Sequence, residues 1–241
     1  MNDFHQHSRF FIDRVNTASG YFLVGGSEIQ HIRVKRLEKG GNIIGLDGKG
    51  VEYYGEVEAT HRDEVICRIL EVKKHPQPRC KINLCLSVLK PGPMSMAVEK
   101  AVELGVWGII PIKAERSQRR LYANEAGRLQ RIALAAMKQS GQVFLPKVSV
   151  SMSLAEFLAM PKGTHRLLYA DAQGEGILQA NRIANKIFLC IGPEGGFSEA
   201  EIEALQENEG TPVSLGRRRL RSETAAMTAL AVLQLKNSEK I

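Results

Sequence analysis

The stretch "INLCLSVLKPGPMSMAVEKAVELGVWGIIPI", residues 82–112, decides the fold class. It opens with a run of mostly apolar residues, which is typical of a strand buried on both faces. Apolar residues then recur at helical spacing, with Pro93 suited to a first turn and Gly105 to the position after the last turn. Because the closing "GIIPI" predicts another strand, the stretch indicates a strand, a helix and a second, parallel strand.

The same alternation continues along the rest of the chain. Apolar runs typical of strands follow at 147–150, 165–171, 186–192 and 212–216. Helical spacing is found at 121–140, 153–160, 198–210 and 223–236, and Ser153 is the expected N-cap of the second of these helices. Strands that alternate with helices form parallel sheets, so the sequence predicts an α/β domain with a largely parallel sheet over residues 74–241.

Residues 1–73 have a different pattern, with short β-like runs and little helical spacing. These runs are "YFLVGG", "NIIGLDG", "VEYYGEVEAT" and "EVICRILEV", and "DGKG" at 47–50 is a hairpin signal. The following "KKHPQPRC", residues 73–80, has two prolines and no apolar periodicity, which is typical of a linker. The sequence therefore predicts a small all-β domain, expected to be a barrel, before the α/β domain.

The chain of 241 residues is basic, with a formal net charge of +7 and a pI near 9.3. This charge favours a polyanionic partner, nucleic acid first, although a solvated positive surface is the plain alternative. No segment approaches the roughly 18 apolar residues of a spanning helix, and the first residues do not have the pattern of a signal peptide. We therefore expect a soluble, cytoplasmic protein with no membrane partner.

The four cysteines are Cys67, Cys80, Cys85 and Cys190, and no two of them form a CxxC pair. They are expected to be buried or free thiols of a reducing compartment. His75 with Cys80 and Cys85 would form a zinc site only with a fourth ligand at suitable spacing. The sequence has no such ligand, so we expect no metal.

A glycine-rich turn lies in "IGPEGGFSEAEIEAL", residues 191–205. It has neither the lysine nor the spacing of a Walker phosphate loop, and it does not follow the first strand as a Rossmann turn does. The carboxylate of Glu194 would repel a phosphate but is compatible with a cation. The plain alternative is a simple connection, in which the paired glycines permit positive φ and Ser198 forms a capping box with Glu201.

A second motif, "VSLGRRRLRSETAAMTAL", occupies residues 213–230 and also leads from a strand to a helix. Arginine is found at four of the five positions 217–221. Charges at this density repel one another unless they face anions or open solvent. Ser222, Glu223 and Thr224 place hydroxyls and a carboxylate at a helix N-terminus beside these arginines. The motif is therefore either a solvated loop or part of a binding site.

Together with "KPGPMSMAVEKAVELGVWGIIPI", "ERS" and "QSGQ", these two motifs closely resemble the ribosomal RNA small subunit methyltransferase E family of the SPOUT superfamily. The resemblance spans nearly the whole chain. It implies methylation of N3 of a uridine in 16S ribosomal RNA, with S-adenosylmethionine as cofactor. It also implies a trefoil-knotted methyltransferase domain at 74–241, an RNA-binding PUA-like β-barrel at 1–73, and a homodimer that acts on the small ribosomal subunit. The chain departs from the family's usual residues at Lys138, Gln142, Arg217 and Ser222.

By resemblance, three loops form the cofactor pocket. The residues expected to bind the cofactor are Tyr169, Ala170, Ile191, Gly192, Pro193, Glu194, Gly195, Gly196, Ser214, Leu215, Gly216, Leu220, Thr224 and Ala225. Glycines let backbone groups approach a ligand closely, and apolar neighbours such as Leu215 and Leu220 suit an adenine ring.

N3 of uridine carries a proton, so its reactivity as a nucleophile depends on the loss of that proton. A carboxylate can remove the proton, or a guanidinium can stabilise the anion that its loss leaves on O2 and O4. We assign Arg221 the stabilising and positioning role, and Glu223 the role of base or of loop organiser. Basic residues that are candidates for RNA contacts are Arg9, His31, Arg33, Lys35, Arg36, Arg116, Arg119, Arg120 and Arg217.

Two other functions fit the same fold and charge. A catalytically inactive RNA-binding protein would need the barrel and the basic surface, but not two loops shaped for a cofactor. A methyltransferase acting on transfer RNA would need both loops. The three hypotheses differ in whether a methyl group is transferred, and to which RNA.

Overall fold

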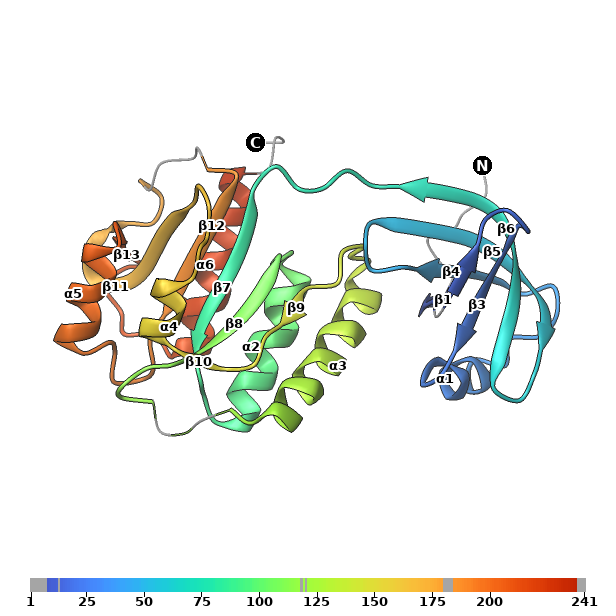
Figure 1. Ribbon diagram of the computed structural model, residues 1–241, viewed down its shortest axis with the longest axis horizontal. Helices are drawn as coiled ribbons and strands as arrows, with labels where there is room; N and C mark the ends of the chain where they lie inside the picture. Colours follow the sequence, from blue (N-terminus) through green and yellow to red (C-terminus); the bar gives the residue numbers. More distant parts are fainter. Residues whose placement is uncertain (1–7, 13, 118, 120, 180–183, 238–241) are drawn as a thin grey trace. The chain divides into compact units, whose positions relative to one another are not determined.

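The computed structural model describes residues 8–12, 14–117, 119, 121–179 and 184–237 (Figure 1). The chain divides into two compact units. The first is Met1–Gln77 together with Met137–Leu145, and the second is Pro78–Ala136 together with Pro146–Ile241. Within the described residues, every helix is too short or too polar to span a membrane.

The first unit is built on a six-stranded sheet. Its elements are β1 (Ser8–Phe11), β2 (Arg14–Asn16), β3 (Tyr21–Gly25), α1 (Glu28–Val34), β4 (Asn42–Leu46), β5 (Val51–Thr60) and β6 (Glu64–Lys74). The order across the sheet is β1-β4-β5-β6-β3-β2, and β1 pairs with β4 in parallel while the other pairs are antiparallel. No pairing in the described part of the chain joins β1 to β2, so the sheet is open and the expected barrel is not confirmed.

The predicted hairpin turn connects β4 to β5. The carboxylate of Asp47 accepts hydrogen bonds from the backbone N–H groups of Lys49 (2.7 Å) and Val51 (3.0 Å). Gly48 and Gly50 have φ angles of 67° and 102°, which favour glycine. The turn chemistry expected from "DGKG" is therefore confirmed.

Phe22 of β3 is fully buried in the core of the first unit. Two strand glycines leave room for its ring. An added Cβ would lie 2.8 Å from ring atom Cε2 at Gly45, and 2.5 Å from ring atom Cε1 at Gly55. Ile29 and Ile32 of α1 add to the same core. Glycine is required inside these strands because the aromatic ring occupies the space of a side chain.

A segment from later in the chain, Met137–Leu145, also belongs to the first unit. Lys138 Nζ lies 2.5 Å from Glu28 Oε1, and the Gly50 N–H donates to a carbonyl of the segment at 3.0 Å. The predicted domain boundary after residue 73 falls inside β6. The local sequence pattern does not indicate that the chain returns to the first unit at Met137–Leu145, because this return depends on contacts between distant parts of the chain.

The second unit is an α/β domain with a parallel sheet, as the alternation predicts. Its elements are β7 (Lys81–Ser87), α2 (Pro91–Glu103), β8 (Gly108–Lys113), α3 (Ala123–Ser140, whose last residues belong to the first unit), β9 (Lys147–Val148), β10 (Met152–Ser153), α4 (Leu154–Ala159), β11 (Arg166–Gly176), β12 (Lys186–Ile191), α5 (Glu199–Glu207), β13 (Thr211–Ser214) and α6 (Ser222–Asn237). The order across its seven-stranded sheet is β10-β8-β7-β12-β11-β13, with β9 paired to β8. Every pair is parallel.

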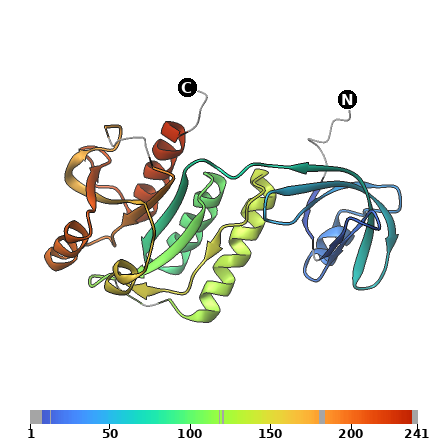
Figure 2. The same cartoon turned by 45° about the horizontal axis from the view of Figure 1, so that its top comes forward.

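Helices cover both faces of this sheet (Figure 1, Figure 2). β7 and β12 lie at its centre and are buried along nearly their whole length. Cys85, Phe188 and Cys190 pack with Phe157 of α4 and Leu205 of α5. α2 packs against α6, which also contacts β7 and β12. Strands buried on both faces explain why the sequence has continuous apolar runs here instead of alternation.

The helix ends follow the expected chemistry. α2 starts at Pro91, so Pro93 lies in its first turn as expected, and Gly105 beyond its end has a φ of 78°. Ser153 caps α4, with Ser153 Oγ accepting from the Glu156 N–H (3.2 Å) and the Glu156 carboxylate accepting from the Ser153 N–H (2.7 Å). The predicted N-cap is therefore confirmed as a full capping box.

The cysteines are free and buried, as expected. Burial raises the pKa of the Cys67 thiol to about 12, and it also raises the pKa of the Cys85 thiol, which lies beside Cys190 across β7 and β12. The His75 ring lies 2.7 Å from the Glu52 carboxylate. In the described ranges, no group of His, Cys, Asp and Glu side chains could hold a metal ion.

We expect Gly55→Ala to lower the free energy of unfolding by about 1 to 3 kcal/mol, because the added methyl group would overlap the buried Phe22 ring. Urea denaturation followed by circular dichroism measures this change. Gly127→Ala is the control, because an added Cβ there meets nothing within 4 Å. Its position inside α3 predicts a gain of about 0.5 to 1 kcal/mol. Equal stabilities for the two variants would contradict the packing described.

Candidate functional site

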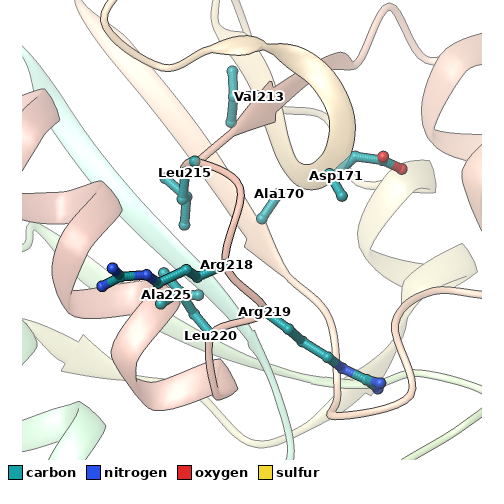
Figure 3. Close-up of a pocket in the computed structure, with 10 residues that line it drawn as sticks. Ala170, Asp171, Val213, Leu215, Arg218, Arg219, Leu220 and Ala225 are labelled. Carbon is teal, nitrogen blue, oxygen red and sulfur yellow. The ribbon is translucent and has the colours of Figure 1, made fainter.

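A cavity of about 170 Å³ lies beside β11, β13 and the start of α6 (Figure 3). Its lining residues are Ala170, Asp171, Ala172, Val213, Leu215, Gly216, Arg218, Arg219, Leu220 and Ala225. The pairing of β11 with β13 shifts register between Ala170 and Glu175, so the strand is irregular where it borders the cavity. Because ligands of parallel α/β sheets bind at the carboxyl ends of the strands, this cavity is the candidate site.

Half of the residues that line the cavity were expected from the sequence to bind the cofactor. Ala170, Leu215, Gly216, Leu220 and Ala225 were expected and are present. Asp171, Ala172, Val213, Arg218 and Arg219 line it as well and were missed. The first two directly follow a predicted residue, so a wider window along that strand would have included them. The arginines belong to a run in which no local pattern indicates the direction of each side chain.

The loop between β13 and α6 supplies much of the apolar wall. Gly216 has a φ of 107°, and its N–H donates to Ser214 Oγ at 3.3 Å. Figure 3 shows Leu215, Leu220 and Ala225 gathered on this side of the cavity. Partly exposed apolar side chains with a few polar groups are the usual chemistry of a site for a small organic ligand.

The glycine-rich turn connects β12 to α5. Gly196 has a φ of 72°, and its N–H donates to the Pro193 carbonyl at 2.8 Å. Gly195 does not use the positive φ that the sequence permits, so one glycine is enough to form the turn. The predicted capping box of Ser198 and Glu201 is confirmed. The plain structural role of this segment is therefore present, whatever ligand it contacts.

Two side chains of the second motif hold carbonyl groups of this turn. Ser222 Oγ donates to the Gly192 carbonyl at 2.8 Å, and Arg219 Nη2 donates to the Glu194 carbonyl at 2.6 Å. Arg219 also lines the cavity, so the turn is fixed beside it. Figure 3 shows the side chains of Arg218 and Arg219 pointing in opposite directions. The two sequence motifs are therefore in direct contact and form one site.

The loop after β8 supplies a third contact with the turn. Arg116 Nη1 donates to the carbonyls of Gly195 (2.9 Å) and Phe197 (3.3 Å). The N–H of Glu115 donates to the Glu201 carboxylate at 2.8 Å. Hydrogen bonds from a charged donor are stronger than neutral ones, so this contact restrains the turn. Arg116, a candidate for RNA contact, is used inside the protein here.

The remaining residues predicted to bind a cofactor are not part of the cavity lining. They are Tyr169, Ile191, Gly192, Pro193, Glu194, Gly195, Gly196, Ser214 and Thr224. The Tyr169 side chain is buried in the core, and its hydroxyl accepts a hydrogen bond from Gln206 Nε2 at 3.4 Å. A ligand in the cavity could meet Tyr169 only through its backbone.

The two candidate catalytic residues flank the start of α6. The Arg221 side chain is exposed, and its carbonyl accepts the Ala225 N–H at 2.8 Å. Glu223 is buried, with 8% of its surface exposed. An exposed guanidinium can bind an anion from outside the protein, whereas a buried carboxylate acts on neighbouring protein groups.

The other basic candidates of the second unit differ in availability. Arg119 Nη2 lies 2.5 Å from Glu125 Oε1, and this guanidinium holds the pKa of the Glu125 carboxyl below its usual range. Arg217 is exposed. Arg120 lies outside the described residues.

In the first unit, two of the basic candidates face carboxylates. Arg9 Nη2 lies 3.9 Å from Glu52 Oε1, and His31 Nδ1 lies 3.8 Å from Glu28 Oε2. The exposed candidates are Arg33, Lys35 and Arg36. Arg33 Nη2 also donates to the Arg62 carbonyl at 2.8 Å, so exposure does not by itself mean that a basic group lacks a contact within the unit.

The chain is similar to known proteins over most of its length. Residues 75–234 match the family described as the RNA methyltransferase domain. The chain is 30% identical to ribosomal RNA small subunit methyltransferase E of Bacillus subtilis over 227 residues, which cover 88% of this chain and 89% of the relative. It is 32% identical to the protein of that name from Aquifex aeolicus over 213 residues, which cover 86% of this chain and 90% of the relative.

Two solved structures with bound S-adenosylmethionine share the fold over 95% of the chain. One is ribosomal RNA small subunit methyltransferase E of Neisseria gonorrhoeae, with 26% identity and a TM-score of 0.86. The other is described as a methyltransferase of Legionella pneumophila, with 29% identity and a TM-score of 0.87. Each alignment covers 95% of this chain and 98% of the other.

We expect Arg116→Ala to loosen the glycine-rich turn, because two of its carbonyls lose a charged donor. Hydrogen–deuterium exchange of the amides at 195–198 should become about tenfold faster. Arg128→Ala is the matched control, because Arg128 Nη1 donates to Ser95 Oγ at 2.9 Å elsewhere in the second unit. Unchanged exchange in the turn of the Arg116 variant would show that this contact does not hold it.

Proposed function

This chain belongs to the ribosomal RNA small subunit methyltransferase E family, and from that premise we propose that it methylates N3 of a uridine in 16S ribosomal RNA with S-adenosylmethionine. The contact between the two motifs carries the proposal. Ser222 and Arg219 hold the glycine-rich turn beside an apolar cavity, which is a built site and not two unrelated loops. The similar protein of Neisseria gonorrhoeae was solved with S-adenosylmethionine bound.

The residues around the cavity suit this cofactor. Val213, Leu215 and Leu220 offer apolar surface of the kind that an adenine ring requires. Asp171 places a carboxylate in the lining, and the adjoining turn carries Glu194, so the local charge is compatible with a sulfonium cation. When bound, S-adenosylmethionine supplies an electrophilic methyl group. The predicted turn residues, with Ser214 and Thr224, are proposed to contact it through backbone and hydroxyl groups.

Methyl transfer requires N3 to lose its proton, and the proposed roles of Arg221 and Glu223 follow from their exposure. Because the Arg221 guanidinium is exposed, it is proposed to contact the uracil ring and to stabilise negative charge on O2 and O4. The buried Glu223 carboxylate sits in the first turn of α6. Because it is buried, the Glu223 carboxylate is better suited to organise the arginine-rich loop at 215–221 than to contact the uracil of the substrate. The orientation that Arg221 imposes also lowers the barrier, because in-line attack needs a fixed geometry.

The first unit is proposed to be a PUA-like domain that binds the substrate RNA. Arg33, Lys35 and Arg36, at the end of α1, are exposed and give this surface positive charge. Arg9 and His31 are weaker candidates, since each faces a carboxylate. The proposed partner is the small ribosomal subunit in the cytoplasm.

We also propose the trefoil knot and the homodimer typical of the superfamily. In support of the knot, the start of α6 is held at Gly192 after β12, while its body packs against α2 and β7 from the beginning of the domain. In support of the dimer, α2 and α6 expose Met96 (50%) and Leu235 (57%), which offer apolar surface to a second copy.

We expect Arg221→Ala to lower kcat by about a hundredfold or more, because the anion on uracil loses its stabilising charge. The affinity for S-adenosylmethionine should stay nearly unchanged. The assay uses labelled cofactor and small subunits that lack the modification, followed by mapping of the labelled nucleotide. Arg131→Ala, which removes an exposed arginine of α3, is the control. Collapse of cofactor affinity would show that Arg221 is misassigned, and label found only in transfer RNA would refute the substrate.

We expect RNA binding to weaken steeply with salt, because the proposed contacts are between basic side chains and phosphates. Each phosphate neutralised should contribute about 0.7 to 0.9 log units of affinity per log unit of salt. A titration between low and moderate salt measures the slope. Arg36→Ala should reduce this slope by the contribution of one phosphate contact. An affinity that does not change with salt would show that RNA is not the partner.

A further inference from the structure

A second cavity, of about 520 Å³, lies in the second unit and has no role in the function proposed above. Its lining residues are Lys113, Leu121, Tyr122, Ser151, Met152, Ser153 and Glu156. Lys113 is the last residue of β8, and it pairs with Ser153 of the parallel strand β10. The cavity is therefore at the carboxyl edge of the sheet, where substrates of this fold class bind.

Tyr122 presents an aromatic ring at this cavity from a fixed backbone. The residue is 68% exposed. Its N–H donates to the Glu125 carboxylate at 3.1 Å, and its carbonyl accepts the Ala126 N–H at 3.2 Å. The preceding Leu121 is buried, and its carbonyl accepts a hydrogen bond from Ser151 Oγ at 2.9 Å. Because the backbone that carries the ring is held in this way, stacking on a partner costs no backbone ordering at Tyr122.

The cavity carries one cationic side chain, Lys113, and one anionic side chain, Glu156, so Lys113 is its only charged group that can attract negative charge among the described residues. Lys113 has no ion pair within the described part of the chain, so its ammonium is available. The Glu156 carboxylate is already bonded to the N–H and hydroxyl of Ser153, and these bonds hold the pKa of Glu156 below its usual range. An aromatic platform beside an available cation matches a nucleobase with its phosphate.

One loop connects this cavity to the candidate active site. The segment 113–122 lines the cavity with its two ends, Lys113 and Tyr122. Between them, Arg116 binds the Gly195 carbonyl of the glycine-rich turn. Lys113 of the cavity and Arg116 at the glycine-rich turn are therefore only three positions apart in the same loop.

We propose that this second cavity is a subsite for an unpaired nucleobase of the substrate RNA, near the target uridine. The base stacks on the Tyr122 ring, and the Lys113 ammonium contacts its phosphate or an exocyclic oxygen. Stacking tolerates any base, so the subsite adds affinity and fixes the strand without reading sequence by itself. This inference rests on the proposed function, because it assigns the cavity to the same RNA.

The test compares Tyr122→Leu, Tyr122→Phe and Lys113→Gln with the wild-type protein. The measurements are the Kd for a fluorescent single-stranded RNA, KM and kcat for methylation of small subunits, and the Kd for S-adenosylmethionine. We expect Tyr122→Leu to raise the RNA Kd and KM about tenfold, while Tyr122→Phe keeps near wild-type values. Met160→Ala is the matched control, because it removes an exposed apolar side chain (43%) that does not line the cavity.

Photo-crosslinking gives an independent readout. RNA that contains 4-thiouridine should crosslink to the peptide with Tyr122 in the wild-type protein, and the crosslink should be lost in the leucine variant. Unchanged RNA affinity in the leucine variant, or crosslinks only elsewhere, would overturn the subsite. A wild-type protein that binds RNA through Tyr122 but transfers no methyl group would refute the proposed function and retain the subsite. Equal melting temperatures of all variants exclude misfolding as the cause.

Discussion

The capture of backbone carbonyls in the glycine-rich turn is the interaction on which the site depends. Ser222 and Arg219 bind the carbonyls of Gly192 and Glu194 from one side. Arg116 binds the next carbonyls from the loop after β8. Two segments far apart in sequence are thereby fixed around one turn. Because the loop that carries Arg219 also lines the cavity, the wall of the cavity and the turn beside it are positioned together.

The structure divides the basic residues of this chain into two groups with different uses. Arg116, Arg119 and Lys138 are occupied by carbonyls or carboxylates of the protein. Their partners are groups of the protein itself, so these residues contribute to the fold. Arg217 and Arg221 are exposed. Net charge alone could not make this distinction.

Several predictions held because the signals are local. The apolar runs, the proline and glycine at the ends of α2, and the capping boxes of Ser153 and Ser198 all act within a few residues. The candidate cavity was half predicted for a related reason, since Leu215 and Leu220 belong to a loop that the motif marks as a whole. Asp171 was missed because its place in the lining depends on where β11 meets β13.

The sequence by itself determined the strands and helices of the parallel α/β domain, because periodicity and capping are properties of neighbouring residues. The expectation of an all-β first unit was wrong, since α1 lies within it. The two motifs were paired by their resemblance to a family. Only the tertiary structure decided that the sheet of the first unit is open, that Met137–Leu145 joins it, and which way each arginine points. It also decided that "IGPEGG" is held by side chains from two other loops. These features arise from contacts between residues distant in sequence, whose free energy no local pattern records.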